Sequence, residues 1–388
     1  GEVQIKQLND RSKMYYTPNK ENNVFQLVVQ YGAGEREFPK LGYAAQLMNN
    51  AGIMGAYEPQ ELKEELSKLN ATCHVTADDD NLYIIMEGYE ATLPQACQLL
   101  SRQILMPKLD EKQLARLKGS AMGMRQQRKD NVSILNEALR QYMLYGEKSD
   151  YIKELTDKEI YELQISELTG DINRASNYEA KVFFTGTLPF DQVYDILSKN
   201  LPLVANERPS NSPQAKDMMP VTENTVYFLP NNDAEQAQIH LYIPMQKADK
   251  KDDVLRSAFN QYFGLDFTGI VLNEIREKRS MAYTAYAFVG TQGIAGKASY
   301  LRGYIGTQND KANDALDVLM GLVNDMPKNP ERIDNIKSYL RQAMLTSHPS
   351  FRNKAMELVD LGYRGYTDDP AKENLPKVDA LTFDDIVK

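Results

Sequence analysis

The sequence predicts an α+β fold that is built from two related modules. The chain has 388 residues, and because domains usually have about 100 to 200 residues, two domains are expected. Strand-like apolar segments alternate with segments whose apolar residues recur at helical spacing. One stretch rich in Pro, Asn and Ser interrupts this pattern near the middle of the chain, which indicates a boundary between the modules.

The first module begins with a predicted strand at residues 23–31 (NVFQLVVQY), which is apolar and rich in β-branched side chains. Gly32, Gly34 and Pro39 follow it and end the strand. The next elements are two helices, expected at residues 41–54 and 58–69.

A strand pair is expected at residues 72–77 and 82–86, joined by the acidic turn at residues 78–81. The rest of the module is mostly helical by its three- and four-residue apolar spacing. These remaining elements are helices at residues 93–105, 110–128 and 132–144, a strand at residues 181–185 (KVFFT) and a closing helix at residues 191–201.

Residues 205–222 (ANERPSNSPQAKDMMPVT) lack the periodicity of their flanks and are typical of a linker. The sequence therefore predicts an N-terminal module at residues 1–205, a linker at residues 206–222 and a C-terminal module at residues 223–388.

The pattern starts again after this linker. The strand expected at residues 238–243 matches the one that starts near Val24, and residues 381–386 (LTFDDI) match residues 155–160 (LTDKEI). The offsets, 238 − 24 = 214 and 381 − 155 = 226, are nearly constant, which indicates an ancient duplication. The second copy ends before a counterpart of strand 181–185, so a truncated C-terminal module is expected.

Composition excludes two classes of partner. The net charge of −9 and the pI near 5.2 disfavour binding to a phosphate backbone, so no nucleic acid is expected. No apolar run approaches the roughly 18 residues that a membrane-spanning helix requires.

Cys73 and Cys97 are expected to be buried thiols. The chain starts at Gly1 with neither an initiator Met nor a signal peptide, which is typical of a processed or excised piece and leaves the compartment open, a periplasmic or other extracytoplasmic one included.

A segment of the second module resembles a known family. Residues 264–274 (GLDFTGIVLNE) precede Arg276-Glu277-Lys278, and Tyr283 follows Arg276 by seven residues. This order resembles the C-terminal module of insulinase- and pitrilysin-type zinc metallopeptidases (inverzincins). The resemblance implies a metallopeptidase clamshell half of two homologous modules, each an antiparallel β-sheet with helices packed on one face.

Active members of this family carry His-x-x-Glu-His on the first helix, with the two ligands and the general base on one helix face. Alignment through Gly42-Tyr43-Ala44 puts Ala45, Met48 and Asn49 at the His, Glu and His positions. None of the three suits zinc chemistry. The third ligand would be a Glu on a later helix, yet residues 115–129 contain no acidic side chain. The resemblance therefore implies that this chain has no catalytic residues and binds no metal.

The implied function is that of an inactive partner half of a zinc endopeptidase, which closes the proteolytic chamber. In such a half, Arg276 and Tyr283 would bind the peptide substrate for an active His-x-x-Glu-His half, in the same polypeptide or in a separate subunit. Zinc is expected on that active half. The alternative is a non-proteolytic structural scaffold subunit of the same fold.

Other candidate sites favour ordinary structural roles. His74 lies on a predicted strand between threonines, where an exposed imidazole is expected rather than a metal ligand. Asp78, Asp79 and Asp80 lack the spacing of a calcium loop and are expected to form a solvated turn.

Overall fold

The computed structural model describes residues 3–388, and its internal contacts divide the chain into two compact units. Unit 1 consists of the chain up to Lys129, Glu154–Gln214 and Pro349–Val359, and unit 2 consists of Asp130–Lys153, Ala215–His348 and Asp360–Lys388. Each unit is thus assembled from separated segments, whereas the division proposed from the sequence follows chain order.

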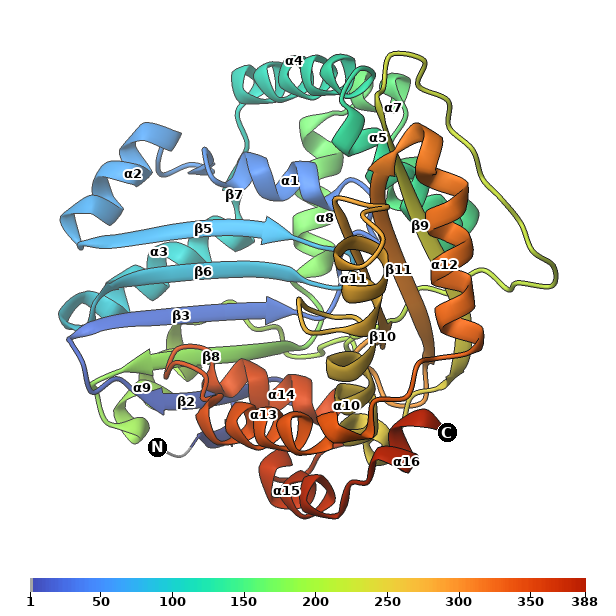
Figure 1. Ribbon diagram of the computed structural model, residues 1–388. Helices are drawn as coiled ribbons and strands as arrows, with labels where there is room; N and C mark the ends of the chain where they lie inside the picture. The colour runs from blue at the N-terminus through green and yellow to red at the C-terminus, as the bar shows by residue number, and fades with distance from the viewer. Residues whose placement is uncertain (1–2) are drawn as a thin grey trace. The chain divides into compact units, whose positions relative to one another are not determined.

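Unit 1 contains a six-stranded sheet (Figure 1). Its strands, in spatial order, are β1 (Gln4–Gln7), β2 (Lys13–Pro18), β8 (Ala180–Gly186), β3 (Val24–Tyr31), β6 (Leu82–Tyr89) and β5 (Ala71–Ala77). The α+β class is confirmed, but the expectation of a purely antiparallel sheet needs a correction, because β2 and β8 pair in parallel. The short connection makes β2 and β3 run in opposite directions, so β8, which lies between them antiparallel to β3, must run parallel to β2.

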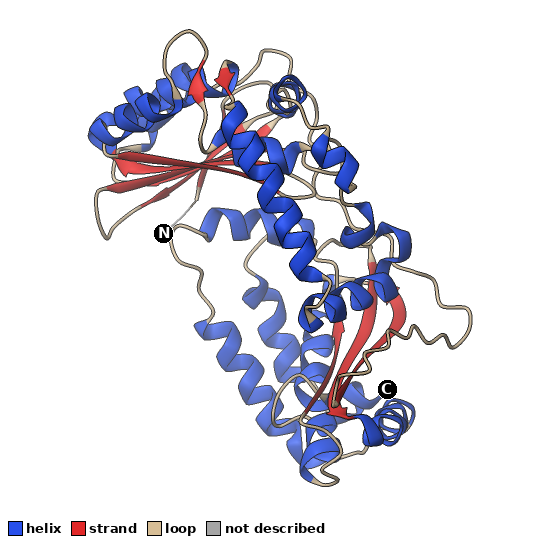
Figure 2. Ribbon diagram, turned by 90° about the horizontal axis from the view of Figure 1, so that it is seen from above, coloured by secondary structure: helices blue, strands red, loops and turns tan. Residues whose placement is uncertain are grey.

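The helices of unit 1 bury one face of this sheet, which Figure 2 shows nearly edge-on. The shared core joins strand residues such as Phe25, Leu27 and Phe184 to apolar side chains of the helices. A smaller apolar cluster lies on the opposite face, where Ala355 packs with Val28 and Phe183. The helices of unit 1 are α1 (Leu41–Met48), α2 (Pro59–Lys68), α3 (Leu93–Leu105), α4 (Glu111–Arg128), α7 (Asp157–Tyr161), α8 (Ile165–Ala175), α9 (Phe190–Asn200) and the first part of α14 (Lys354–Tyr363).

The first helix is shorter than predicted, since α1 ends at Met48 rather than at residue 54. The chain then turns into strand β4 (Gly52–Ile53), which pairs with β7 (Pro107–Lys108). A Cβ at Gly52 would lie 2.0 Å from the carbonyl oxygen of Tyr57, so this close approach requires glycine. Apolar periodicity does not report such a backbone contact.

Unit 2 contains the antiparallel sheet β10 (Thr284–Gly290), β11 (Ala298–Gln308) and β9 (Gln236–Lys247), in that spatial order. One face of this sheet packs on helices to form a second core, which includes Ile305, Ala258 and Leu319. The other helices of unit 2 include α5 (Val132–Tyr145), α6 (Asp150–Lys153), α10 (Asp253–Phe263), α11 (Ile270–Leu272), α12 (Ala312–Asn324), α13 (Ile333–Thr346), α15 (Pro370–Ala380) and α16 (Phe383–Val387).

The two sequence segments matched at an offset of 226 adopt the same local structure. Thr156 starts α7 and Thr382 starts α16, and each forms a reciprocal capping box with the acidic residue three positions later. Residues 209–235, which include most of the predicted linker, contain no helix or strand.

Candidate functional site

The helix that would carry a zinc motif is a structural helix in this chain. Ala45 and Met48 are 1% and 2% exposed and belong to the core of unit 1. Alanine offers no donor atom, and the Met48 thioether lies among apolar neighbours. Two of the three motif positions are thus occupied by packing side chains.

Asn49, at the third position, is committed to the backbone of an edge strand. Its Nδ2 donates to the carbonyl oxygen of Val75 at 2.9 Å, and its Oδ1 accepts from the Val75 amide at 2.8 Å. Val75 lies on β5, which pairs only with β6 in the sheet. Asn49 thereby satisfies one amide and one carbonyl that would otherwise be unpaired at the sheet edge.

The residues present do not fit a zinc ion. Within residues 3–388 no three His, Cys, Asp or Glu side chains come together in a way that could hold a metal. Residues 115–128, within the segment where the third ligand is expected, lie on α4, and they include basic side chains that form ion pairs. Arg128 forms an ion pair with Glu154, and Arg125 forms one with Asp157 at 2.7 Å.

The Arg276–Tyr283 segment forms a tight reversal in unit 2. Arg276 lies in a π-helical turn, η4 (Asn273–Glu277), that continues α11. The Ser280 amide donates to the carbonyl of Arg276 at 2.9 Å, and the Met281 amide donates to that of Ile275 at 2.9 Å. Ser280 takes a positive φ of 51°, which reverses the chain toward β10.

The side chain of Glu274 forms ion pairs with two basic side chains of this reversal. Its carboxylate, 14% exposed, pairs with Lys278 at 2.7 Å and with Arg279 at 2.6 Å, and the hydrogen bonds from these two cations lower its pKa. Two of the three basic residues in the motif therefore share an ion pair with one carboxylate. The sequence reading missed Glu274, although the Glu274–Lys278 spacing of four residues was a signal for this pair.

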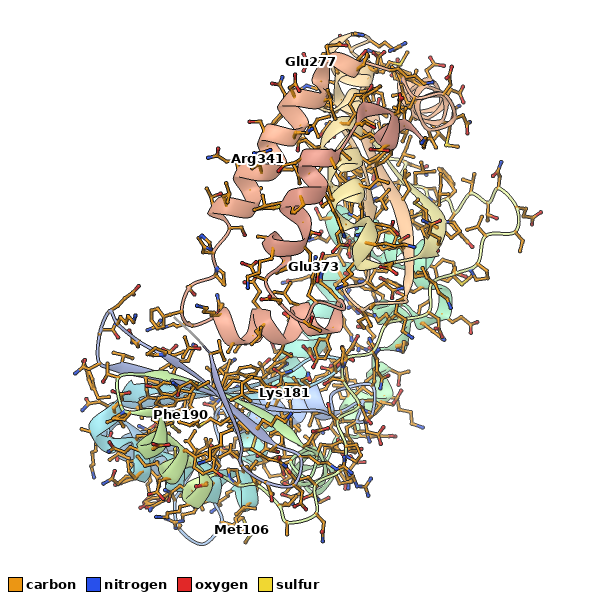
Figure 3. The ribbon with its side chains drawn as sticks, turned by 90° about the horizontal axis from the view of Figure 1, so that it is seen from below. Met106, Lys181, Phe190, Glu277, Arg341 and Glu373 are labelled. Carbon is orange, nitrogen blue, oxygen red and sulfur yellow. The ribbon has the colours of Figure 1, made fainter. Side chains whose placement is uncertain are left out.

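Arg276 and Tyr283 both reach solvent. The Arg276 side chain is 45% exposed and forms a loose ion pair, 3.6 Å from Nε to Oε1 of Glu277, its neighbour labelled in Figure 3. Tyr283 is 49% exposed, and its backbone amide donates to the carbonyl of Gly306 at 2.8 Å. The reversal thus places both side chains on one short segment, free to contact a ligand, without joining them in a shared hydrogen bond.

Comparison with known families identifies this part of the chain. Residues 176–340 match the family model described as the peptidase M16 inactive domain. These residues, which make up less than half of the chain, are thus similar to that family. This confirms the resemblance to insulinase- and pitrilysin-type peptidases. Arg276 and Tyr283 both lie inside the matched M16 region.

Solved structures share the fold along nearly the whole chain. An M16 inactive domain from Pseudomonas fluorescens has 18% identity and a TM-score of 0.72, with 99% of this chain and 93% of that chain covered. A mutant ferredoxin protease FusC in complex with Arabidopsis ferredoxin has 13% identity and a TM-score of 0.76, and the periplasmic protease PqqL from Escherichia coli has 14% and 0.73. Each alignment covers 99% of this chain but only 42% of FusC and 44% of PqqL, so the chain spans less than half of either protease. The comparison with curated proteins gave no match.

No helix in residues 3–388 is both long enough and apolar enough to span a bilayer.

Proposed function

We propose that this chain is the non-catalytic half of a zinc endopeptidase. It closes with a His-x-x-Glu-His half around an internal chamber, and it contributes Arg276 and Tyr283 to peptide binding. The active half belongs to the same polypeptide or to a separate subunit, and the zinc is bound there. The observation that carries the proposal is the solvent exposure of Arg276 and Tyr283 inside an M16 inactive domain.

The chemistry of the two side chains supports this role. A guanidinium presents several N–H donors and a phenol presents one O–H donor, so both can bind a peptide carbonyl. Donors placed where negative charge develops on that oxygen stabilise the transition state more than the ground state. Because Lys278 and Arg279 are both ion-paired with Glu274, Arg276 is the basic residue of the motif that is available for substrate.

The test requires the complete two-half enzyme and a peptide substrate. Loss of one hydrogen-bond donor to a developing oxyanion lowers the rate by roughly 100- to 1,000-fold, whereas loss of a structural hydroxyl costs about 1 kcal/mol of stability and changes the rate little. We therefore expect Tyr283→Phe and Arg276→Ala to lower kcat/KM by at least about tenfold while the enzyme stays folded.

Matched substitutions on α13 serve as controls. Tyr339 is 52% exposed and Arg341 is half exposed, so Tyr339→Phe and Arg341→Ala change the same groups away from the motif. If Tyr283→Phe keeps kcat/KM within about threefold of the parent, a direct catalytic contribution is wrong. The scaffold function would then become the better proposal.

A further inference from the structure

The outer face of the unit 2 sheet carries a continuous array of aromatic rings. Alternation places Ala285, Ala287 and Ile305 in the core, so their neighbours project from the opposite face. The rings of Tyr286 and Tyr304 stack at 5.4 Å between centroids, Tyr286 and Phe288 lie at 6.2 Å, and Tyr304 and His240 at 5.1 Å. The array crosses all three strands.

Arg302 lies in the middle of this face without a polar partner. In the sheet register it is opposite Phe288 on one side and Tyr242 on the other, and its guanidinium sits 5.4 Å from the Phe288 ring centre. Among residues 3–388 no hydrogen bond or ion pair involves the side chain of Arg302, and its Nε is buried. A partly buried cation without an acceptor is unfavourable, so a negatively charged ligand would be stabilised here.

Helix α5 borders the array, and its charged side chains leave a net positive charge beside Arg302. The carboxylate of Glu137 is bound by Arg140 on the same helix, and Asn136 Oδ1 lies 2.8 Å from His240 Nε2. Burial and the nearby Arg140 and Arg302 lower the pKa of His240 to about 4, so this imidazole is neutral near pH 7. The formal charges of Glu137, Arg140 and Arg302 sum to +1.

We propose that this face is a binding site for acidic peptide segments, in which Arg302 holds a Glu or Asp carboxylate and the flanking rings pack against the neighbouring peptide side chains. The carboxylate fits because a guanidinium can donate two parallel hydrogen bonds to its two oxygens. The inference rests on the proposed function in one respect, since it names the class of peptide that such a half would select.

Fluorescence anisotropy with two labelled peptides tests this directly on the purified chain. One peptide is amidated Gly-Ser-Phe-Glu-Ala-Glu-Ser-Gly, and its twin has Gln in place of both Glu residues. We expect the Glu peptide to bind at least about tenfold more tightly than the twin, and the difference to shrink as salt is added. Arg302→Gln should weaken binding of the Glu peptide about tenfold, to the level of the twin, and Arg302→Lys should keep part of the preference.

Arg341→Gln is the matched control, because it removes one cation from α13 of the same unit, and it should change the dissociation constant less than twofold. Equal affinities of the parent for both peptides, no saturable binding of either, or an unchanged Glu-peptide affinity in a folded Arg302→Gln variant would each overturn the proposal. The assay contains no active half, so its outcome is independent of the rate measured for Tyr283→Phe.

Discussion

At the scale of single residues, the three positions that were predicted to correspond to the zinc motif have structural contacts. Ala45 and Met48 pack in the core of unit 1, whereas Asn49 forms two hydrogen bonds with the backbone at the edge of β5. An amide group suits this position, because it can donate a hydrogen bond to the carbonyl and accept one from the N–H of the same residue. An imidazole does not form both hydrogen bonds with a single residue. The same three side chains thus explain both the fold of α1 and its lack of metal ligands.

Zinc content follows from these residues. Tight zinc binding requires several N, S or carboxylate ligands in tetrahedral geometry, and α1 offers none of them. We expect the purified chain to contain far less than one zinc per molecule after dialysis against a weak chelator, as measured by elemental analysis. One tightly held zinc per chain would contradict this prediction.

His240 makes stability depend on pH. Its pKa is lowered from the ordinary value of 6.5 to about 4 in the folded chain, so the unfolded state binds more protons between these values. Stability is therefore greatest above pH 6.5 and falls as the pH drops toward 4. A full unit of pKa is worth about 1.4 kcal/mol, and solvent reduces the effect for a partly exposed ring, so we expect the parent to lose about 1 to 2 kcal/mol between pH 7 and 5 through this residue.

Urea unfolding of the parent and of His240→Gln at both pH values checks this. The variant cannot gain the proton, so its stability should fall less over the same interval, and the difference isolates His240 from the carboxylates that both proteins share. Parallel losses in the two proteins would show that His240 does not contribute.

At the scale of elements, the contact between α1 and β5 depends on the two hydrogen bonds of Asn49. Each intramolecular hydrogen bond typically contributes about 1 kcal/mol, and an amide or carbonyl left unpaired costs more. We expect Asn49→Ala to lower the free energy of unfolding by about 2 to 3 kcal/mol in urea titrations. Asn50→Ala is the control, because the side chain of Asn50 accepts a hydrogen bond from the exposed Lys63, and its loss should change stability by less than about 0.5 kcal/mol. Equal effects of the two substitutions would contradict the role of Asn49.

Local patterns predicted most elements of the first module, and the failures have a physical cause. The helices at residues 93–105 and 110–128 were placed almost to the residue, since their apolar spacing and their starts at Thr92 and Asp110 are local features. The pairing of β4 with β7, which follows the end of α1, and the parallel pairing of β2 with β8 depend on contacts between residues that are distant in sequence. Hydrophobic periodicity contains no information about such contacts.

The sequence predicted some residues of the candidate sites but not others. Ala45, Met48, Asn49, Arg276 and Tyr283 came from a motif of fixed spacing, and the structure adds what each contacts or leaves open. That Arg276 and Tyr283 act on a substrate remains a prediction. Arg302 and His240 are 62 residues apart, so only the sheet register of β9 and β11 reveals that they share a face.

At the scale of the whole molecule, the two units are assembled from interleaved parts of the chain. Residues 130–153, which include α5, belong to unit 2, although the division predicted from the sequence assigns them to the first module. Residues 349–359, which include the start of α14, belong to unit 1, where Ala355 packs with Val28 and Phe183. A division at the linker therefore separates segments from the unit to which they contribute.

A single cut in residues 209–235 should consequently leave the molecule in one piece. A site-specific protease sequence inserted between Asn231 and Asn232, which are both exposed, allows the cut without loss of any helix or strand. After cleavage, the N-terminal fragment still supplies α5 to unit 2 and the C-terminal fragment still supplies the start of α14 to unit 1. We expect both fragments to elute together in size-exclusion chromatography at the volume of the uncut chain and to separate only in urea, because their buried apolar surface holds them together in water. Two separate peaks in buffer, each from a folded fragment, would show that the modules divide in chain order at the linker and that the interleaved segments contribute little to stability.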